Sequence, residues 1–313
     1  MSWQQRRAFN ATSPDPEGLA RLARDVAGSG ARVTGLRRLR GGVDASTHAV
    51  RVEPGGWLVL KRTWSSDPRS LTGEWHRLAA VESAHVPTPT PIALDVTGAW
   101  FGRPALVMSH LPGTSTLERH ADAWIDGMAE ALAEIHEVAV SADASATIGR
   151  DHAGVTWAPA SPDVLRRTPL VESLIEVAGT LQADLRCDGE GGVLLHHDLH
   201  QGNVLTRRGR LTGVVDWNEA CIGPPECDVA YASVDLAMVI GRRAADRFVA
   251  TYRRVSGRDL VDLRRWQALW TVSDLRWVKY WVGSFVEVGA ADLTLPVLRR
   301  RLRAFGAYVL VEC

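Results

Sequence analysis

The segment LLHHDLHQGN, residues 194–203, concentrates side chains that could do chemistry. It holds three of the chain's ten histidines, together with Asp198 and Asn203. Three histidines could bind zinc, but no supporting fold pattern accompanies them. A carboxylate and an amide oxygen are instead the hard ligands that suit Mg²⁺, and a carboxylate can also take a proton from a hydroxyl. The segment alone allows either kind of site, so the rest of the chain must decide.

A predicted β-hairpin follows this segment. Strand-like runs cover 204–206 and 211–215, and the turn RRGR joins them. Asn203 enters the first run and Asp216 leaves the second, so their Cα atoms would lie within about 5 Å if they pair directly. Asp198 lies on the loop just before. We expect these three side chains to converge as a phosphoryl-transfer site, in which Asn203 and Asp216 bind Mg²⁺ and Asp198 is the catalytic base.

The spacing of these residues resembles a known pattern. His196-x-Asp198-x-x-x-x-Asn203, followed by Asp216, is similar to the catalytic and metal-binding residues of protein-kinase-like enzymes. HHDLHQGNVL, VVDW and GPPECDVAY resemble more closely the aminoglycoside phosphotransferase and choline kinase family. The resemblance covers roughly residues 33–236 and implies a nucleotide-dependent kinase.

The sequence departs from the family at two loop positions. His197 stands where the family usually has Gly, and Gln201 stands where it often has Pro. Both changes predict an altered loop geometry with retained chemistry. Downstream, Asp228 has two interpretations. It caps a helix that starts near Val229, or, as the resemblance implies, it braces the segment 194–203, called the catalytic loop from here on. His196 is expected to brace the loop by hydrogen bonds.

The resemblance also implies nucleotide-binding residues in the first third of the chain. LRGGVDASTHAVRV supplies a glycine-containing turn, in which Gly41, Gly42 and Ser46 would approach the phosphates. WLVLKR places Lys61 on the next strand to bind the α- and β-phosphates, and GEWHRL places Glu74 in the following helix as its ion-pair partner.

A second nucleotide-binding element is implied by ALVMSHLPG. Met108, Ser109 and Leu111 resemble the family's linker, whose backbone groups bind the adenine edge. Ser109 replaces a frequent acidic residue, which leaves this backbone recognition unchanged.

Turn signals and periodicity predict the elements that must position these residues. A helix capped by Asp15 or Ser13 precedes three antiparallel strands near 33–40, 46–52 and 57–63. A helix, an extended segment and a second hairpin within 100–113 follow, and helices dominate from residue 120. The expected fold class is α+β. It is a two-lobed protein-kinase-like fold, with a small antiparallel-sheet lobe at 1–108 and a larger, mainly helical lobe at 109–313.

The charge and composition of the chain limit the classes of partner that we expect it to bind. The formal net charge is zero, which argues against nucleic acid or an anionic membrane as the main partner. The four cysteines form no CxxC pair and predict reduced thiols, and the N-terminal sequence lacks an apolar stretch of signal-peptide length. We therefore expect a cytoplasmic monomer or homodimer that acts on a small-molecule hydroxyl acceptor.

A tryptophan stripe in the last third of the chain has two interpretations. Its members recur at the spacing of one helix face: Trp266, Trp270, Trp277 and Trp281. They either pack between helices or line an acceptor pocket, where rings stack on a sugar or a cation. Three acidic residues lie nearby: Asp274, Glu287 and Asp292. These could bind a cationic amine or be surface charges.

Together these features predict a kinase that transfers the γ-phosphate of ATP to a hydroxyl of an antibiotic (aminoglycoside-like or other) or a related metabolite. The expected cofactor is Mg²⁺, and GTP is an alternative donor. Alternatives with the same fold are a choline, amino-alcohol or sugar kinase and a non-catalytic nucleotide-binding pseudokinase. A protein kinase fits less well, because Trp217 and Asn218 follow Asp216 in place of Phe-Gly and no Ala-Pro-Glu follows. A metal hydrolase would instead retain zinc or manganese through purification.

Overall fold

The chain divides into two compact units. The computed structural model describes residues 3–39, 45–82, 84–115, 122–140, 148, 168–184, 192–287 and 289–311 of the 313-residue chain. The first unit comprises Met1–Ser83 and Pro87–Pro112, and the second comprises Ala84–Val86 and Gly113–Cys313. Among the described helices, none is long and apolar enough to cross a membrane.

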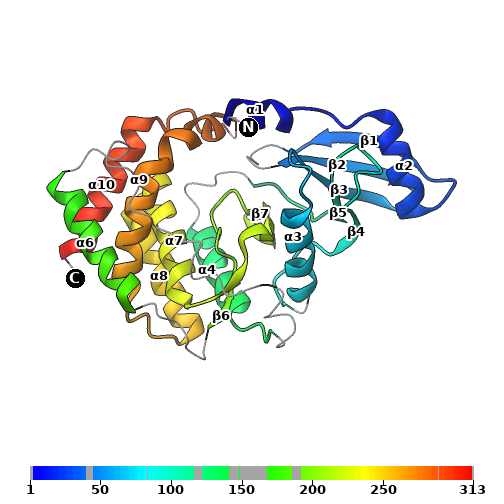
Figure 1. Cartoon of the computed structure of the whole chain (residues 1–313). Coiled ribbons are helices and arrows are strands. Elements are labelled where there is room, and N and C mark those ends of the chain that lie inside the picture. The colour runs from blue at the N-terminus through cyan, green and yellow to red at the C-terminus, as the bar shows by residue number, and fades with distance from the viewer. Residues whose placement is uncertain are drawn as a thin grey trace. The chain divides into compact units, whose positions relative to one another are not determined.

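A five-stranded antiparallel sheet forms the centre of the first unit (Figure 1). Its strands are β1 (Arg32–Arg38), β2 (Ala45–Glu53), β3 (Gly56–Thr63), β4 (Pro91–Asp95) and β5 (Ala105–Ser109), in the order β1-β2-β3-β5-β4. The three strands expected between residues 33 and 63 are confirmed. The register of β2 and β3 pairs Lys61 with Thr47 and Leu60 with His48.

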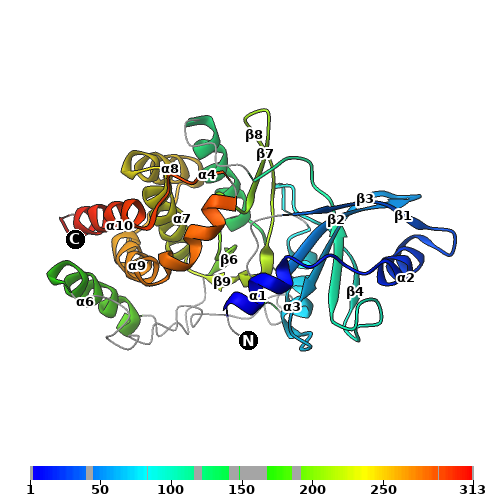
Figure 2. The same cartoon turned by 90° about the horizontal axis from the view of Figure 1, so that it is seen from above.

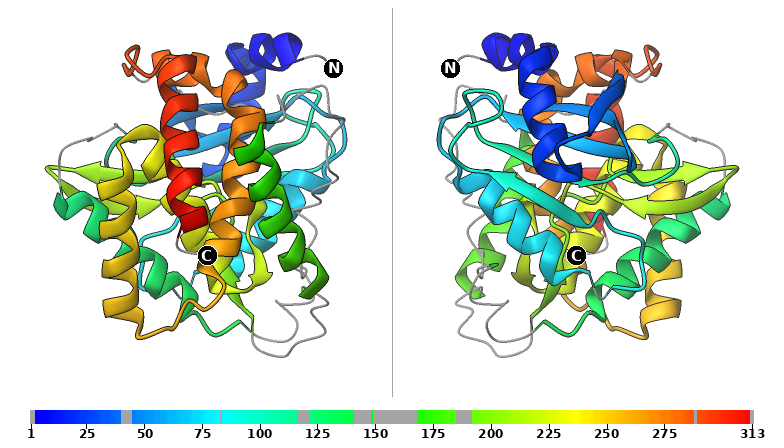
Figure 3. Two further views of the ribbon diagram at one scale, coloured as in Figure 1. Left: turned by 90° about the vertical axis from the view of Figure 1, so that its left-hand side faces the viewer. Right: turned by 90° about the vertical axis from the view of Figure 1, so that its right-hand side faces the viewer.

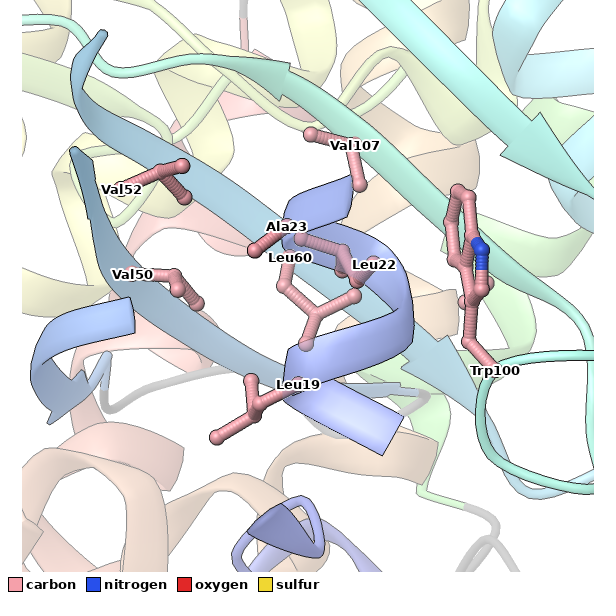
Figure 4. Packing of buried hydrophobic residues seen from close by; sticks show 9 residues of the cluster. Leu19, Leu22, Ala23, Val50, Val52, Leu60, Trp100 and Val107 are labelled. Atoms are coloured by element: carbon pink, nitrogen blue, oxygen red, sulfur yellow. The ribbon is translucent and has the colours of Figure 1, made fainter. Parts of the chain in front are cut away.

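Helices cover both faces of this sheet. They are α1 (Trp3–Asn10), α2 (Pro16–Ala27) and α3 (Arg69–Ala80). α2 begins where the sequence predicts, because the Asp15 side chain accepts the Gly18 N–H at 2.7 Å. Its Leu19 and Leu22 pack against Leu60 and against apolar residues of β2 and β5 (Figure 4). Neighbouring strand residues point to opposite faces, so Lys61 lies on the face away from α2.

The second predicted hairpin forms differently from our expectation. Both of its strands were expected within 100–113, but its first strand is β4, in the proline-rich segment before that range. Asp95 ends β4, and its carboxylate accepts the N–H groups of Thr97, Gly98 and Trp100. These bonds fold the following residues into a compact loop, so the chain re-enters the sheet only at β5.

The described helices of the second unit pack as a layered bundle. They are α4 (Asp122–His136), α6 (Pro169–Asp184), α7 (Pro225–Val239), α8 (Arg242–Ser256), α9 (Leu263–Glu287) and α10 (Leu295–Val311). α6, α9 and α10 lie side by side (Figure 3), and α7 contacts α8, α9 and α10. α7 is buried on nearly every side, so the polar residues it carries are held inside the unit.

Two small sheets frame the segment 194–203. β7 (Val204–Arg207) and β8 (Arg210–Val214) form the predicted hairpin, which is visible in Figure 2. β6 (Val193–Leu195) pairs with β9 (Cys221–Gly223), and a short 3₁₀ helix, η1 (Trp217–Glu219), lies between β8 and β9. The sequence did not predict the β6–β9 pair, because strands of three residues are too short to carry a periodicity signal.

Candidate active site

Lys61 and Glu74 form an ion pair within the first unit. The Lys61 Nζ lies 2.9 Å from Glu74 Oε1 and 2.8 Å from Oε2, and the exposed fractions of the two side chains are 12% and 2%. β3 directs Lys61 away from α2, and α3 carries Glu74 to meet it. Burying an ion pair costs desolvation energy that a surface pair avoids, so a pair retained here suggests a use beyond stability.

Ser46, which was also predicted to bind the nucleotide, lies apart from Lys61 in this unit. Ser46 pairs with Arg62, not with Lys61, so it lies on the opposite face of the sheet from Lys61. Its buried hydroxyl donates to the Thr12 carbonyl at 3.0 Å and accepts from Arg62 at 3.0 Å. The structure therefore does not bring Ser46 together with Lys61. Gly41 and Gly42 lie outside the described residues.

The predicted adenine-binding linker begins inside the sheet. Met108 and Ser109 are the last residues of β5, which is hydrogen-bonded between β3 and β4. Ser109 also accepts the Thr90 N–H through its side chain at 2.9 Å. Leu111 follows the strand and lies next to the end of the first unit at Pro112.

The Asp198 carboxylate in the second unit is held by two donors, one on each oxygen. The Tyr231 hydroxyl donates to Asp198 Oδ1 at 2.6 Å, and the Asn203 Nδ2 donates to Oδ2 at 3.0 Å. Asn203 Nδ2 also donates to the Asp198 carbonyl at 2.9 Å. An ionised carboxylate can accept up to about four hydrogen bonds, so each oxygen keeps capacity for a further donor such as a substrate hydroxyl.

Asn203 and Asp216 lie close in the ladder but are not direct partners. Val204 pairs with Val214, and the Asn203 carbonyl accepts the Val215 N–H at 2.9 Å, so Asp216 lies one residue beyond the position opposite Asn203. The Asn203 amide nitrogen is committed to Asp198, which leaves its side-chain oxygen to act as a ligand. An amide oxygen and a carboxylate fit Mg²⁺, which completes its shell with water and substrate phosphates.

Asp228 braces the catalytic loop. α7 begins at Pro225, so Asp228 lies inside its first turn and does not cap it. Its fully buried carboxylate accepts the backbone N–H groups of His196 at 2.7 Å and His197 at 2.8 Å, and it lies 3.3 Å from His136 Nε2. Burial by itself would raise the pKa of the Asp228 carboxyl. The His136 hydrogen bond and the nearby histidines overcome this and hold that pKa below its ordinary value.

His196 is structural, as the sequence predicted. Its Nε2 lies 3.1 Å from the Val215 carbonyl, which can only accept, so Nε2 carries the proton. Its Nδ1 then accepts the Asp198 N–H at 3.3 Å. Burial lowers the pKa of His196, which keeps the ring neutral in this arrangement. His196 thereby joins the catalytic loop to the end of β8.

The unusual His197 has a backbone conformation that favours glycine. Its φ of 65° is left-handed, a region that costs a non-glycine residue about 1–2 kcal/mol. The Asp228 bond to its N–H and the packing of its ring against Trp270, 5.8 Å away, offset this strain. His197 therefore adopts the left-handed backbone that a glycine would adopt without strain.

Sequence reasoning did not assign Tyr231 or Asp235 to the site, and it left Asp274 with two interpretations. Tyr231 and Asp235 lie one turn apart on α7, and Asp274 lies on α9, with both carboxyl groups buried. Burial raises the pKa of Asp235 to about 6, and burial together with Asp235 and Asp198 raises that of Asp274 well above its ordinary value. The available signal was Tyr231 and Asp235 at helical spacing within the mostly apolar run DVAYASVDLAMV.

The tryptophan stripe does not act as one surface. Trp266 is buried in the bundle, whereas Trp277 is 42% exposed. Trp270 lies near the catalytic loop, where its ring contacts Tyr231 at 4.8 Å and its Nε1 donates to the Cys227 carbonyl. Of the three nearby acidic residues, Asp274 is buried, Asp292 is exposed and the Glu287 side chain lies outside the described part of the chain.

Several solved structures with the same fold are described as phosphotransferases. Macrolide 2'-phosphotransferase MphH from Brachybacterium faecium is 21% identical, with a TM-score of 0.62 over 89% of this chain and 99% of that chain. APH(2")-IIa, in a ternary complex with streptomycin and ATP, is 16% identical, with a TM-score of 0.58 over 91% of this chain and 100% of that chain. A mutant of aminoglycoside 2'-phosphotransferase-IIIa in complex with GDP is 17% identical, with a TM-score of 0.60 over 88% of this chain and 94% of that chain.

The likeness to these structures confirms the expected protein-kinase-like fold. A sequence profile described as "APH: Phosphotransferase enzyme family" matches residues 35–269, which is more than half of the chain. This range includes Lys61 and Glu74 in the first unit and the whole catalytic loop in the second. The predicted enzyme class, a phosphotransferase, is thereby confirmed. The chain belongs to the phosphotransferase enzyme family.

Proposed function

We propose that this phosphotransferase transfers the γ-phosphate of ATP to a hydroxyl group of a small molecule in the cytoplasm. The observation that carries the proposal is the Asp198 carboxylate, which two donors orient while both of its oxygens keep capacity for an acceptor hydroxyl. The Lys61–Glu74 pair supports it, because a buried, positioned ammonium suits the binding of nucleotide phosphates.

The proposed reaction is a single displacement. Asp198 accepts the proton of the acceptor hydroxyl, and that oxygen forms a bond to the γ-phosphorus. The bond from this phosphorus to the oxygen bridging the β- and γ-phosphates breaks, and ADP leaves. Lys61, held by Glu74, orients the phosphates. When bound by Asn203 and Asp216, Mg²⁺ supplies charge neutralisation at the phosphates.

The donor nucleotide is proposed from the same features and from two related structures. An aminoglycoside phosphotransferase of this fold is solved with ATP, and another is solved with GDP. We take ATP as the donor and GTP as the alternative. Initial rates with each nucleotide at equal concentration distinguish them.

Lys61→Ala is expected to raise the KM for ATP at least tenfold and to leave the KM for the acceptor within twofold. Loss of a charge-assisted contact to phosphate removes about 1.5–3 kcal/mol, which corresponds to roughly 10- to 100-fold. Lys279→Ala is the matched control, because Lys279 is the chain's other lysine and is exposed on α9. Unchanged ATP kinetics in Lys61→Ala would remove Lys61 from the phosphate site.

We further propose that the acceptor carries a cationic amino group. The charge of Asp198 contributes to the raised pKa of both buried carboxyls, Asp235 and Asp274, and the Oδ2 of Asp235 has no hydrogen-bond partner in the described structure. Ionising two buried carboxyls side by side is unfavourable unless a cation compensates them. Macrolide and aminoglycoside phosphotransferases share this fold, so amine-bearing antibiotics are the first acceptors to test.

Asp235→Asn is expected to raise the free energy of unfolding, relative to the wild-type protein, more at pH 8 than at pH 4. Its folded-state pKa of about 6 lies above the unfolded value near 4, so the native state binds the proton more tightly. The wild-type protein therefore loses stability as pH rises from about 4 to 6, by about 2–3 kcal/mol in total. Urea unfolding of both proteins at the two pH values measures this difference.

The same variant should bind an amine acceptor at least tenfold more weakly at pH 8, since the compensating carboxylate is gone. Asp246→Asn is the control, because Asp246 pairs with Arg242 on the surface of α8. A pH-independent stability difference would contradict the raised pKa of Asp235. An unchanged acceptor KM would remove it from the acceptor site.

A nucleotide-consumption screen tests the proposed function. The panel comprises aminoglycosides, macrolides, peptide antibiotics, amino alcohols such as choline, and neutral sugars, with Asp198→Asn as the blank. The proposal requires turnover of an amine-bearing acceptor by the wild-type protein and at least about a hundredfold less by the blank. Turnover of neutral sugars alone would favour a sugar kinase. Nucleotide-induced thermal stabilisation without turnover of any acceptor would favour a pseudokinase.

A further inference from the structure

We infer that Tyr231 is a positioning residue that fixes the orientation of the Asp198 carboxylate for proton transfer. The inference rests on the proposed role of Asp198 as the base. Tyr231 is the last residue of the stretch GPPECDVAY, where sequence reasoning assigned it no role, and its hydroxyl donates to Asp198 Oδ1 at 2.6 Å. This distance lies at the short, strong end of hydrogen bonds to a carboxylate.

Two donors are needed because an aspartate carboxylate rotates readily about the last bond of its side chain. The terminal torsion of an aspartate side chain is broad, so one hydrogen bond does not fix its plane. Asn203 holds Oδ2 from the loop, and Tyr231 holds Oδ1 from α7. Donors from two separate elements fix the plane and leave each oxygen a lone pair. Tyr231 therefore orients the base and does not block the acceptor hydroxyl.

The Tyr231 ring is itself held in place. It meets the Trp270 ring at 4.8 Å with an interplanar angle of 71°, an edge-to-face contact. The Trp270 Nε1 donates to the Cys227 carbonyl at 3.1 Å, one turn before Tyr231 on the same helix. The hydroxyl thus projects from a braced ring, which limits the loss of entropy when it holds Asp198.

The charged groups around Tyr231 favour its protonated hydroxyl, which can donate a hydrogen bond. Burial and three carboxyl groups raise its pKa well above its ordinary value: Asp198 on the loop, Asp235 on α7 and Asp274 on α9. The hydroxyl stays protonated at physiological pH and can donate to the Asp198 carboxylate. Tyr231 therefore cannot replace Asp198 as the base.

Tyr231→Phe tests the inference, with Tyr308→Phe as the matched control. The Tyr308 hydroxyl, on α10, accepts a hydrogen bond from Arg264 Nη2 at 2.9 Å. We expect Tyr231→Phe to lower kcat about tenfold while both KM values change less than threefold. The fold should survive, because the Asp198 side chain is 30% exposed and water can reach the released oxygen. Tyr308→Phe should retain wild-type kcat.

The same change in an Asp198→Asn background separates positioning from a structural role. Tyr231→Phe should cause no further loss of transfer there, and its melting temperature should stay within about 3 °C of its parent. Wild-type kcat in Tyr231→Phe would overturn the inference and leave the proposed function intact. A higher kcat would also overturn it, because Tyr231 would then compete with the acceptor. Absence of turnover in the wild-type protein with every acceptor would overturn the proposed function, and the inference with it.

Discussion

Asp198→Asn is expected to lower kcat by about 10²–10⁴ while the affinity for nucleotide stays within threefold. The substitution keeps the size of the side chain but removes its ability to take a proton. An amide also presents only one acceptor oxygen, so it cannot accept from both Tyr231 and Asn203 as the carboxylate does. Nucleotide affinity should persist, because Lys61 and Glu74 belong to the first unit.

The measurement pairs steady-state kinetics with nucleotide binding by calorimetry. Asp246→Asn removes a surface carboxylate that pairs with Arg242 and should leave both quantities unchanged, because exposed ion pairs contribute little. A kcat within threefold of wild type would exclude Asp198 as the base. A large loss of nucleotide affinity would show that the carboxylate acts mainly in binding.

Asp228→Ala is expected to lower the free energy of unfolding by about 3–5 kcal/mol, the range for removing one partner of a buried charged network. The change leaves the buried N–H groups of His196 and His197 and the ring nitrogen of His136 without the carboxylate they contact. The loop should then lose its shape, and transfer should fall with stability. Urea unfolding at pH 7 measures the first effect, and kcat at low temperature measures the second.

The pH dependence of this effect has a defined sign. The pKa of Asp228 is lower in the folded protein than in the unfolded chain, so its charge stabilises the fold above the unfolded pKa near 4. That contribution is lost as pH falls through the folded-state pKa. The stability difference between wild type and Asp228→Asn should therefore be present at pH 7 and shrink below about pH 4. A difference that grows on acidification would contradict the lowered pKa.

The sequence predicted those features that depend on local order along the chain. The Asp15 cap, the strands around Lys61 and the hairpin after Asn203 all follow from turn residues and periodicity, and all are present. The Lys61–Glu74 pair was implied by the family resemblance, and the structure contains it. The proposed roles of these residues remain predictions for the experiments above.

Features that depend on register or on contacts between distant elements were not predictable. Ser46 is only one position away from the partner of Lys61, yet that single step places it on the other face of the sheet. Asp228 kept two interpretations until the start of α7 was known. Tyr231 reaches Asp198 across 33 residues, and no local pattern specifies such a bond.

The burial of α7 has a consequence for how this enzyme could acquire new substrates. Asp228, Tyr231 and Asp235 follow one another at steps of three and four, so they lie along one stripe of a single rigid helix. A distant substitution that slides or rotates α7 would disturb the loop, the base and the buried charge together. A change at position 235 alone would alter only the charge. Substitutions at Asp235 could therefore change which acceptors bind, while Asp228, near the start of the helix, continues to hold the catalytic loop.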